Sequence, residues 1–232
     1  RVLEEYLKLY DPALAGRFES LRYRVYTVQS GLVSSQLRSR LRGVRLYVLI
    51  TEGLCRGDWL ATAEAAIRGG ADCLQLREKQ MPDRQLLERA RLLTELCHRH
   101  GVLCIVNDRP DIARLAGADG VHVGQQDLPV RQAREIVGPT GLVGKSTHTL
   151  EQAEAALAEQ PDYIAVGPMF ASPTKPQAEL AGPRTFAEVS RCLRERSADS
   201  GGTTGAGPGP RLPAAVVAIG GVTPDNVGAL LA

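Results

Sequence analysis

Residues 102–129 read VLCIVNDRPDIARLAGADGVHVGQQDLP and contain one pattern twice. In each copy a short apolar run suited to a buried parallel strand ends in polar residues, and a proline then opens a helical segment. The apolar runs are 102–106 and 120–123, and the polar residues that follow them are Asn107-Asp108 and 124–127. Because parallel strands that alternate with helices gather their carboxyl ends on one side, this pattern predicts the working face of a (β/α) barrel.

The same alternation extends in both directions along the chain. Further strands are predicted at 44–50, 73–76, 142–144, 163–166 and 215–219, and helices at 59–68, 83–98, 111–115, 129–137, 150–158 and 184–196. We therefore expect an α/β protein, a (β/α)₈ TIM barrel that lacks its eighth strand and helix. An open seven-stranded barrel leaves two parallel edges unpaired, which folded proteins avoid, so we expect a fragment truncated at its C-terminus.

Residues 1–43 differ from this repeat and carry no catalytic constellation. Apolar residues at helical spacing predict three helices there, over 2–10, 12–26 and 32–42. We expect 1–43 to be a helical extension, the end of an upstream accessory domain, and 44–232 to be the catalytic barrel. The composition of residues 198–213 (ADSGGTTGAGPGPRLP) predicts a flexible insertion on the face away from catalysis.

The composition is that of an ordinary globular protein, with 44% hydrophobic and 23% charged residues among 232. A net charge of +2 gives no reason to expect nucleic acid or a membrane surface as a partner, and no apolar run approaches the roughly 20 residues of a membrane span. The five cysteines contain no CxxC pair, and no signal peptide is recognisable. We therefore expect buried thiols in a reducing cytoplasm, and homo-oligomer formation stays open.

Opposite charges meet at the predicted strand ends. Arg77, Lys79 and Lys175 lie in different loops of one barrel mouth, and Asp108 and Asp127 follow adjacent strands. Three cations that face two carboxylates indicate an anionic substrate bridged by a divalent metal ion. Mg²⁺ is the natural candidate, because it takes a few carboxylates together with phosphate oxygens and water. The alternative is ordinary surface ion pairing, which the convergence of all five residues disfavours.

A second anion site is predicted after the last two strands. Gly220 and Gly221 form a small-residue turn ahead of a helix opened by Thr223-Pro224, where backbone N–H groups and the helix dipole would attract a phosphate. In (β/α)₈ barrels the loops after strands seven and eight commonly bind phosphate in this way. The hydroxyls of Ser172 and Thr174 would complete the phosphate shell.

Six short motifs are, taken together, specific to one enzyme family. They are QLREK (75–79), VNDR (106–109), DGVHVGQQDLP (119–129), KSTHT (145–149), GPMFASPTKP (167–176) and AIGGVTPDN (218–226). With them the chain resembles thiamin phosphate synthase over essentially 44–232, and segment 1–30 resembles the end of a helical extension fused ahead of this enzyme in some bacteria. The resemblance implies a transferase that joins hydroxymethylpyrimidine diphosphate to a thiazole phosphate and releases pyrophosphate with Mg²⁺.

The resemblance also implies roles for individual residues. The catalytic residues would be Arg77, Lys79, Ser146 and Lys175. The pyrimidine diphosphate would be bound by Gln75 at the ring and by Leu76, Arg77, Glu78, Lys79, Asn107, Ser146 and Lys175. The thiazole phosphate would be bound by Ser172, Pro173, Thr174 and Gly221, and Mg²⁺ by Asp108 and Asp127. Members of the family ionise the pyrimidine C–O bond before the thiazole nitrogen attacks, a step that cations and a metal favour by stabilising the departing pyrophosphate.

Two alternatives stay open. A thiazole tautomerase of the same fold would need no residues that bind pyrophosphate, so the cations and carboxylates at the strand ends argue against it. A non-catalytic role would suit a degenerate barrel, whereas the motif loops are intact. Ser172 stands where many members have threonine and keeps the hydroxyl, while the missing eighth strand normally adds a backbone contact to the thiazole phosphate. His122 is a weaker candidate, for a general base, because the ionisation needs none.

Overall fold

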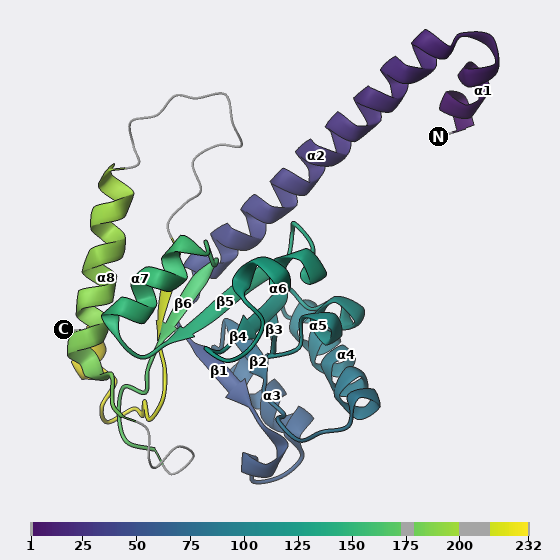
Figure 1. The fold of residues 1–232 in the computed structure, drawn as a ribbon. Helices are drawn as coiled ribbons and strands as arrows, with labels where there is room; N and C mark the ends of the chain where they lie inside the picture. The colour runs from purple at the N-terminus through teal and green to yellow at the C-terminus, as the bar shows by residue number, and fades with distance from the viewer. Residues whose placement is uncertain (1, 173–178, 200–213, 232) are drawn as a thin grey trace.

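Seven parallel strands form the core of the protein in a computed structural model, which describes residues 2–172, 179–199 and 214–231 (Figure 1). Each strand pairs with the next one along the chain, in the order β1-β2-β3-β4-β5-β6-β7. The strands are β1 (Tyr47–Ile50), β2 (Cys73–Leu76), β3 (Leu103–Asn107), β4 (Gly120–Val123), β5 (Leu142–Thr147), β6 (Tyr163–Val166) and β7 (Ala215–Ala218). The curled sheet and the helices around it confirm the predicted α/β, TIM-like barrel fold with helices at its N-terminus.

Helices connect the strands and cover the outer face of the sheet. Along the chain they are α1 (Val2–Tyr10), α2 (Pro12–Arg42), the 3₁₀ helix η1 (Glu52–Leu54), α3 (Trp59–Arg68), α4 (Asp83–Arg99), α5 (Pro110–Ala116), α6 (Val130–Val137), α7 (Leu150–Ala158), α8 (Gly182–Asp199) and α9 (Gly228–Leu231). The last helix starts later than predicted, at Gly228 instead of Thr223-Pro224. The reason is a preceding turn, in which Thr223 N donates to Asn226 Oδ1 at 2.7 Å.

Alternation of side chains along the strands builds two apolar layers. Outward-facing residues such as Leu74, Val106 and Val121 pack beneath the helices. Inward-facing residues form a second core, which also takes in the end of α2: Leu41, Cys73, Leu103, Ile105, Leu142 and Tyr163. Gly144 makes room for the Tyr163 ring, because a Cβ at Gly144 would lie 2.0 Å from that ring.

Strand β5 is longer than the sequence predicts. The prediction ends the strand at Gly144, whereas Lys145, Ser146 and Thr147 continue the parallel pairing with β6. Polar side chains are accommodated there because they find partners within the barrel: the Lys145 ammonium, for example, donates to Gly124 O at 3.0 Å. As a result Lys145 and Ser146 are held by a strand instead of a loop.

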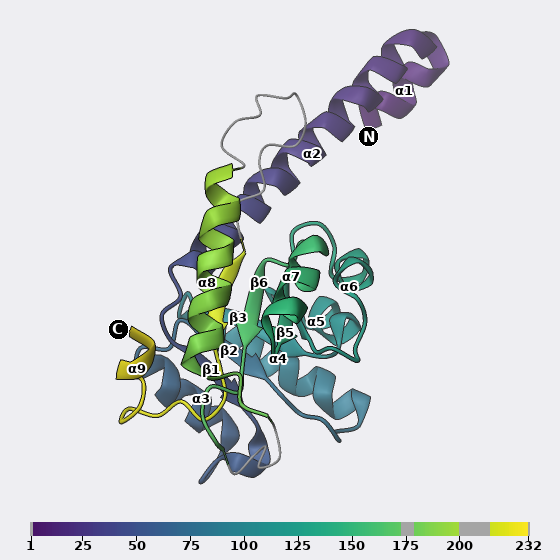
Figure 2. The same ribbon diagram turned by 60° about the vertical axis from the view of Figure 1, so that its left-hand side comes forward.

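The N-terminal extension contains two helices in place of the three predicted. Helix α2 runs unbroken through Gly31, whose cost inside a helix is only about 1 kcal/mol relative to alanine. It projects from the barrel as a long arm, with α1 folded back along its far end (Figure 1; Figure 2). Its other end packs under the barrel, where Leu41 is buried in the inner core and Arg38 Nε lies 2.6 Å from Asp162 Oδ1.

Two remaining expectations concern the insertion and the membrane. Residues 198 and 199 belong to the end of α8, and the rest of the insertion predicted at 198–213 lies outside the described residues. Within the described ranges, no helix combines the length and the apolar character that crossing a bilayer requires.

Candidate functional site

The candidate site lies where strands β2 to β5 end. Gln75 lies in β2, Asn107 ends β3 and Ser146 lies near the end of β5. Asn107 follows Leu103 and Ile105 at alternate positions of β3, so the pleat directs it to the same inner side as these two core residues. The parallel register therefore gathers side chains from separate motifs at one edge of the sheet, as the sequence predicts.

A chain of hydrogen bonds crosses the barrel interior and joins Gln75 to Ser146. Gln75 Nε2 donates to Tyr47 Oη at 2.7 Å, and Tyr47 Oη lies 2.8 Å from Tyr163 Oη. Tyr163 Oη lies 3.0 Å from His122 Nδ1, and His122 Nε2 lies 2.7 Å from Ser146 Oγ. The His122 and Tyr163 rings also stack, with centroids 5.5 Å apart. Two predicted ligand-binding residues are thus positioned by one buried network.

Sequence reasoning did not identify the two tyrosines of this network. Burial, the first cause in each case, raises the pKa of both Tyr47 and Tyr163 well above the usual tyrosine value. Both phenols therefore stay neutral and act as hydrogen-bonding links. The available signal was positional: Tyr47 and Gln75 face inward in neighbouring strands, where a polar atom needs a partner.

Two carboxylates, those of Asp108 and Asp127, meet beside this network. Asp108 has a left-handed backbone, with a φ of 61°, and its N–H donates to His122 O at 2.7 Å. Burial first, and the neighbouring Asp127 carboxyl second, raise the pKa of Asp108 above its ordinary value. Lys79 Nζ lies 3.0 Å from Asp108 Oδ2 and opposes this shift. A left-handed aspartate beside a second carboxylate is a strained arrangement of the kind found at functional sites.

These two carboxylates fit a hard divalent cation. They come from adjacent strands, and the raised pKa of Asp108 marks negative charge that the protein alone does not fully neutralise. No third histidine, cysteine or acidic side chain joins them in a metal-binding group within the described part of the chain. Mg²⁺ commonly uses one or two carboxylates and takes its other ligands from water and phosphate oxygens, so the donor set suits it.

The QLREK motif divides between the site and the barrel wall. The Arg77 guanidinium makes no hydrogen bond or ion pair with any described residue, and Arg77 N donates to Ile50 O at 2.8 Å. Leu76 is fully buried in the outer core. Glu78 braces the wall, because its Oε1 accepts from Glu52 N at 2.7 Å and lies 3.5 Å from Arg89 Nη1. Arg77 therefore has a side chain available to an anion, and the exposed Lys79 ammonium is shared with Asp108.

Lys145 supports the loop that carries Asp127. Its side chain is only 5% exposed, and its ammonium donates to Gly124 O at 3.0 Å. Gly124 N in turn donates to Asp127 Oδ2 at 2.6 Å, and Gln125 Nε2 donates to Ser146 O. A buried lysine that fixes one turn is unusual in a folded protein, since burying a charge is costly unless it is paired or hydrogen-bonded.

The loops after β6 and β7 are pressed together at a pair of glycines. Gly220 and Gly221 have φ values of +90° and +69°, and a Cβ on Gly221 would lie 2.3 Å from Phe170 O. Asn226 Nδ2 donates to Gly221 O at 2.9 Å, which orients that peptide. The Gly221 N–H bonds to no described residue, so it is available to an acceptor. Ser172, two residues after Phe170, is half-buried. Pro173, Thr174 and Lys175 lie outside the described residues.

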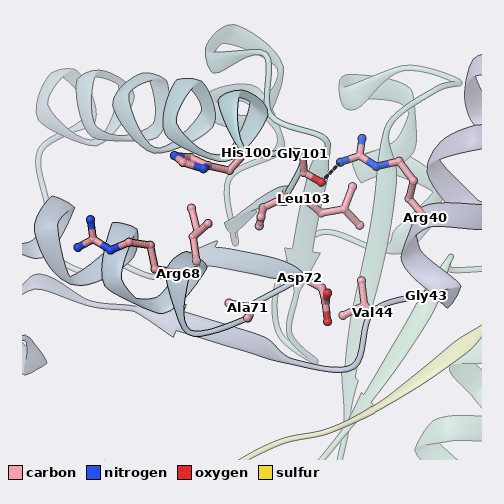
Figure 3. A pocket seen from close by; sticks show the side chains of 12 residues that line it. Arg40, Gly43, Val44, Arg68, Ala71, Asp72, His100, Gly101 and Leu103 are labelled. Carbon is pink, nitrogen blue, oxygen red and sulfur yellow. Dashed lines mark hydrogen bonds between the residues drawn. The ribbon is translucent and has the colours of Figure 1, made fainter.

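A cavity of about 490 Å³ lies at the opposite end of the sheet, where β1 to β3 begin (Figure 3). Arg40, Arg68, Asp72 and His100 are among its lining residues. Arg40 Nη2 donates to Gly101 O at 3.0 Å, and Asp72 Oδ2 accepts from two backbone N–H groups ahead of β1. The polar groups of Arg40 and Asp72 thus bind the protein itself, and none of the predicted site residues that the structure describes lines this cavity.

Comparison with known proteins gives one consistent result. A family model described as thiamine monophosphate synthase matches residues 46–232. The thiamine-phosphate synthase of Synechocystis sp. is 47% identical over 182 residues, 78% of this chain and 52% of the relative. That of Synechococcus sp. is 36% identical over 235 residues, 100% of this chain and 60% of the relative. A solved thiamine phosphate pyrophosphorylase from Pyrococcus furiosus has a TM-score of 0.67 and 29% identity, covering 84% of this chain and 82% of that one. The chain spans about half the length of the curated relatives it matches.

Proposed function

Because the chain belongs to the thiamine monophosphate synthase family, we propose that it carries the catalytic barrel of a transferase. The reaction condenses hydroxymethylpyrimidine diphosphate with a thiazole phosphate and yields thiamin phosphate and pyrophosphate. One observation carries the proposal: the Asp108 and Asp127 carboxylates lie together at the edge of the sheet, with the Lys79 ammonium 3.0 Å from Asp108 Oδ2. Arg77 follows the neighbouring strand β2, and no described residue engages its guanidinium. This is a site for a diphosphate and a divalent cation.

The pyrimidine diphosphate is bound between the buried network and the cations. Gln75 faces the pyrimidine ring, held by Tyr47 so that its carbonyl oxygen stays available. Ser146 and Asn107 donate hydrogen bonds to the diphosphate, and Arg77 and Lys79 supply positive charge to it. Lys175, which lies outside the described residues, is proposed to join this set. The backbone of Leu76 and Glu78 completes the contact, since their side chains are engaged in the barrel wall.

Asp108 and Asp127 would hold Mg²⁺. The ion would neutralise charge on the diphosphate and so favour its departure. This role explains why the fold keeps two carboxylates in contact although burial and mutual repulsion raise the pKa of Asp108. It also explains the buried Lys145, which fixes the loop that presents Asp127.

The reaction breaks one bond to the pyrimidine methylene carbon and forms another, and it needs no proton transfer. The C–O bond between the pyrimidine methylene carbon and the diphosphate breaks, and its electron pair leaves with pyrophosphate. The thiazole ring nitrogen then donates its lone pair to the same carbon, which forms the new C–N bond and a thiazolium cation. Arg77, Lys79 and Ser146 stabilise the negative charge that builds up on the leaving group. His122 is committed on both ring nitrogens to Tyr163 and Ser146, so it positions Ser146 and is not needed as a base.

The thiazole phosphate is held on the other side of the mouth. The Gly221 N–H donates to a phosphate oxygen, and the hydroxyls of Ser172 and Thr174 with the backbone at Pro173 complete the shell. The left-handed backbone of Gly221 and the contact with Phe170 O support this role, because a side chain there could not be accommodated.

The surrounding organisation is proposed in the same way. Residues 1–43 form an accessory extension and 44–232 the catalytic domain, with the insertion at 198–213 remote from the reaction. The protein acts in the cytoplasm, which five free thiols support. We expect no nucleic acid or membrane partner, and the concentration dependence of sedimentation would decide between monomer and homo-oligomer.

The test is pyrophosphate release by the full-length gene product. We expect release only when pyrimidine diphosphate, thiazole phosphate and Mg²⁺ are all present, with thiamin phosphate formed in equal amount. No release by a folded protein would refute the transferase assignment and leave the tautomerase or a non-catalytic role. Release without thiazole phosphate would instead indicate a simple hydrolase.

A further inference from the structure

Helix α2 carries a stripe of apolar side chains at coiled-coil spacing that the described structure leaves exposed. Phe18, Leu21, Val25, Val28 and Leu32 follow one another at intervals of three, four, three and four residues. This is the a and d pattern of a heptad repeat, which places all five side chains on one seam of the helix. Their exposed fractions run from 37% for Phe18 to 63% for Leu32. We refer to these five residues as the α2 seam.

The α2 seam stays exposed although α1 packs beside its first residues and the barrel packs against the end of α2. Helix α1 packs against the first turns of α2, where Ala15 is buried and Arg22 pairs with Glu4 at 2.8 Å. The last turns of α2 pack under the barrel through Leu41. Between these contacts the arm stands clear of the barrel in both views (Figure 1; Figure 2). About four turns of helix therefore present an apolar seam without a described partner.

An exposed apolar seam with this spacing is expected to pack against another helix. Helices in proteins are stabilised mainly by packing of an apolar face, and an isolated stretch of about 15 residues is marginal in water. Regular a and d spacing selects another helix, because knobs of one helix fit holes of the other. A flat surface or an extended strand would not match a seam with a period of about 3.5 residues.

Charges beside the α2 seam restrict what that helix can be. The flanking e and g positions next to the seam hold Arg17, Arg22, Arg24, Gln29 and Gly31, of which Arg22 is already paired with Glu4. The acidic residue of this stretch, Glu19, lies at position b. A second copy of α2 would set Arg17 against Arg22 in a parallel pair, and Arg17 or Arg24 against another arginine in an antiparallel pair, which opposes pairing. A helix with acidic flanking residues would instead form ion pairs across the seam.

We propose that the α2 seam docks an amphipathic helix with apolar a and d residues and acidic flanking residues, supplied by the same full-length polypeptide. The chain spans about half the length of its curated relatives, and the Synechococcus sp. relative matches all of it, α1 and α2 included, while extending well beyond it. The arm is therefore a shared part of a longer architecture, in which further sequence is tethered close to the seam. Tethering raises the effective concentration of that helix far above that of any free partner.

The test is hydrogen–deuterium exchange of the full-length gene product, compared between two matched double variants. Leu21→Asp with Val28→Asp places two charges in the α2 seam. Ser20→Asp with Thr27→Asp places the same charges one residue earlier, at the exposed c positions of the same helix. We expect the seam variant to exchange at least about tenfold faster over 18–32 and over one second segment with acidic heptads outside this chain. The control variant should exchange like the unmodified protein.

One control separates undocking from unfolding, and three results would overturn the proposal. Barrel amides in β2 to β4 should keep their protection in both variants, and pyrophosphate release should persist, which separates undocking from unfolding. Fast exchange of 18–32 in the unmodified full-length protein would overturn the proposal, as would protection that appears only when a separate protein is added. Protection that rises with protein concentration, together with dimerisation abolished by the seam variant, would show that a second copy occupies the seam and would equally overturn it.

Discussion

The ionised Asp108 carboxyl lowers the stability of the folded protein at neutral pH. Its backbone is left-handed, and its carboxyl is partly buried against that of Asp127, so its pKa is raised. A raised carboxyl pKa means that the ionised form is disfavoured in the folded state, and at neutral pH this lowers stability. The Lys79 ion pair offsets only part of that cost. Strain retained at two adjacent carboxylates is expected where a cation is to be bound.

The substitution Asp108→Asn separates function from stability. An asparagine side chain tolerates the left-handed backbone and would remove the repulsion with Asp127, so we expect an unchanged or higher melting temperature. Pyrophosphate release should fall at least about 100-fold, because a ligand of the metal is lost. Thermal unfolding and the release assay on the same preparation check this prediction. Near-normal release would remove Asp108 from the metal site.

Lys145 is expected to act on Mg²⁺ affinity through the loop that it anchors. Lys145→Met keeps the buried aliphatic stem but leaves Gly124 O without its donor, which loosens the turn that holds Asp127. A hydrogen bond from a charged group contributes about 1.5–3 kcal/mol, so the Mg²⁺ concentration for half-maximal release should rise roughly 10- to 100-fold. Lys8→Met, on α1 and paired with Glu5 at the surface, is the matched control. An equal effect of both substitutions would contradict the role assigned to Lys145.

At the scale of elements, the paired loops after β6 and β7 show why glycine is required. Gly221→Ala places a Cβ 2.3 Å from Phe170 O at a φ of +69°, so the loop must shift. A left-handed non-glycine residue costs about 1–2 kcal/mol before any clash, so the KM for thiazole phosphate should rise by about tenfold or more. The KM for pyrimidine diphosphate should change little. Gly16→Ala, which meets no atom within 4 Å, should change neither value. Equal losses for both substrates would refute the assignment of this loop.

Local sequence predicts the elements well where burial alone decides them. Strands β2, β4 and β6 have the predicted bounds, because short apolar runs between turns leave a parallel strand few alternatives. The predicted β5 is too short, since the polar residues after Gly144 look like a loop until their partners are known. Lys145 is satisfied by Gly124 and Ser146 by His122, 21 and 24 residues away. Such contacts leave no trace in a local pattern.

The residues of the candidate site also divide into those that the local sequence predicts and those that only long-range contacts reveal. Loop residues such as Lys79 and Asp108 are predictable because each stands at a strand end, and the barrel brings strand ends together. Tyr47 and Tyr163 escape prediction because 116 residues separate two phenols that lie 2.8 Å apart. Their strands are predicted correctly or nearly so, and only the inward direction of both side chains reveals the link.

At the scale of the whole molecule, α2 is tied into the barrel by a buried ion pair. Arg38 and Arg134 both contact Asp162, at 2.6 and 2.8 Å, and the Asp162 carboxylate is almost fully buried. Arg38→Met leaves that carboxylate with one cation fewer, so the free energy of unfolding should fall by about 1–3 kcal/mol. Denaturant unfolding measures this, with Arg131→Met, whose surface pair with Glu135 contributes at most about 1 kcal/mol, as control. A stability equal to that of the control would show that α2 is not anchored at Asp162.

We infer that the carboxyl ends of β2 to β5 bind the diphosphate. The most direct test is a crystal structure of the full-length gene product with pyrophosphate, thiamin phosphate and Mg²⁺. We predict the metal on Asp108 and Asp127, pyrophosphate against Arg77 and Lys79, and the pyrimidine ring at Gln75. Ligands bound in the cavity at the amino ends of β1 to β3, or a metal bound away from both carboxylates, would refute this assignment.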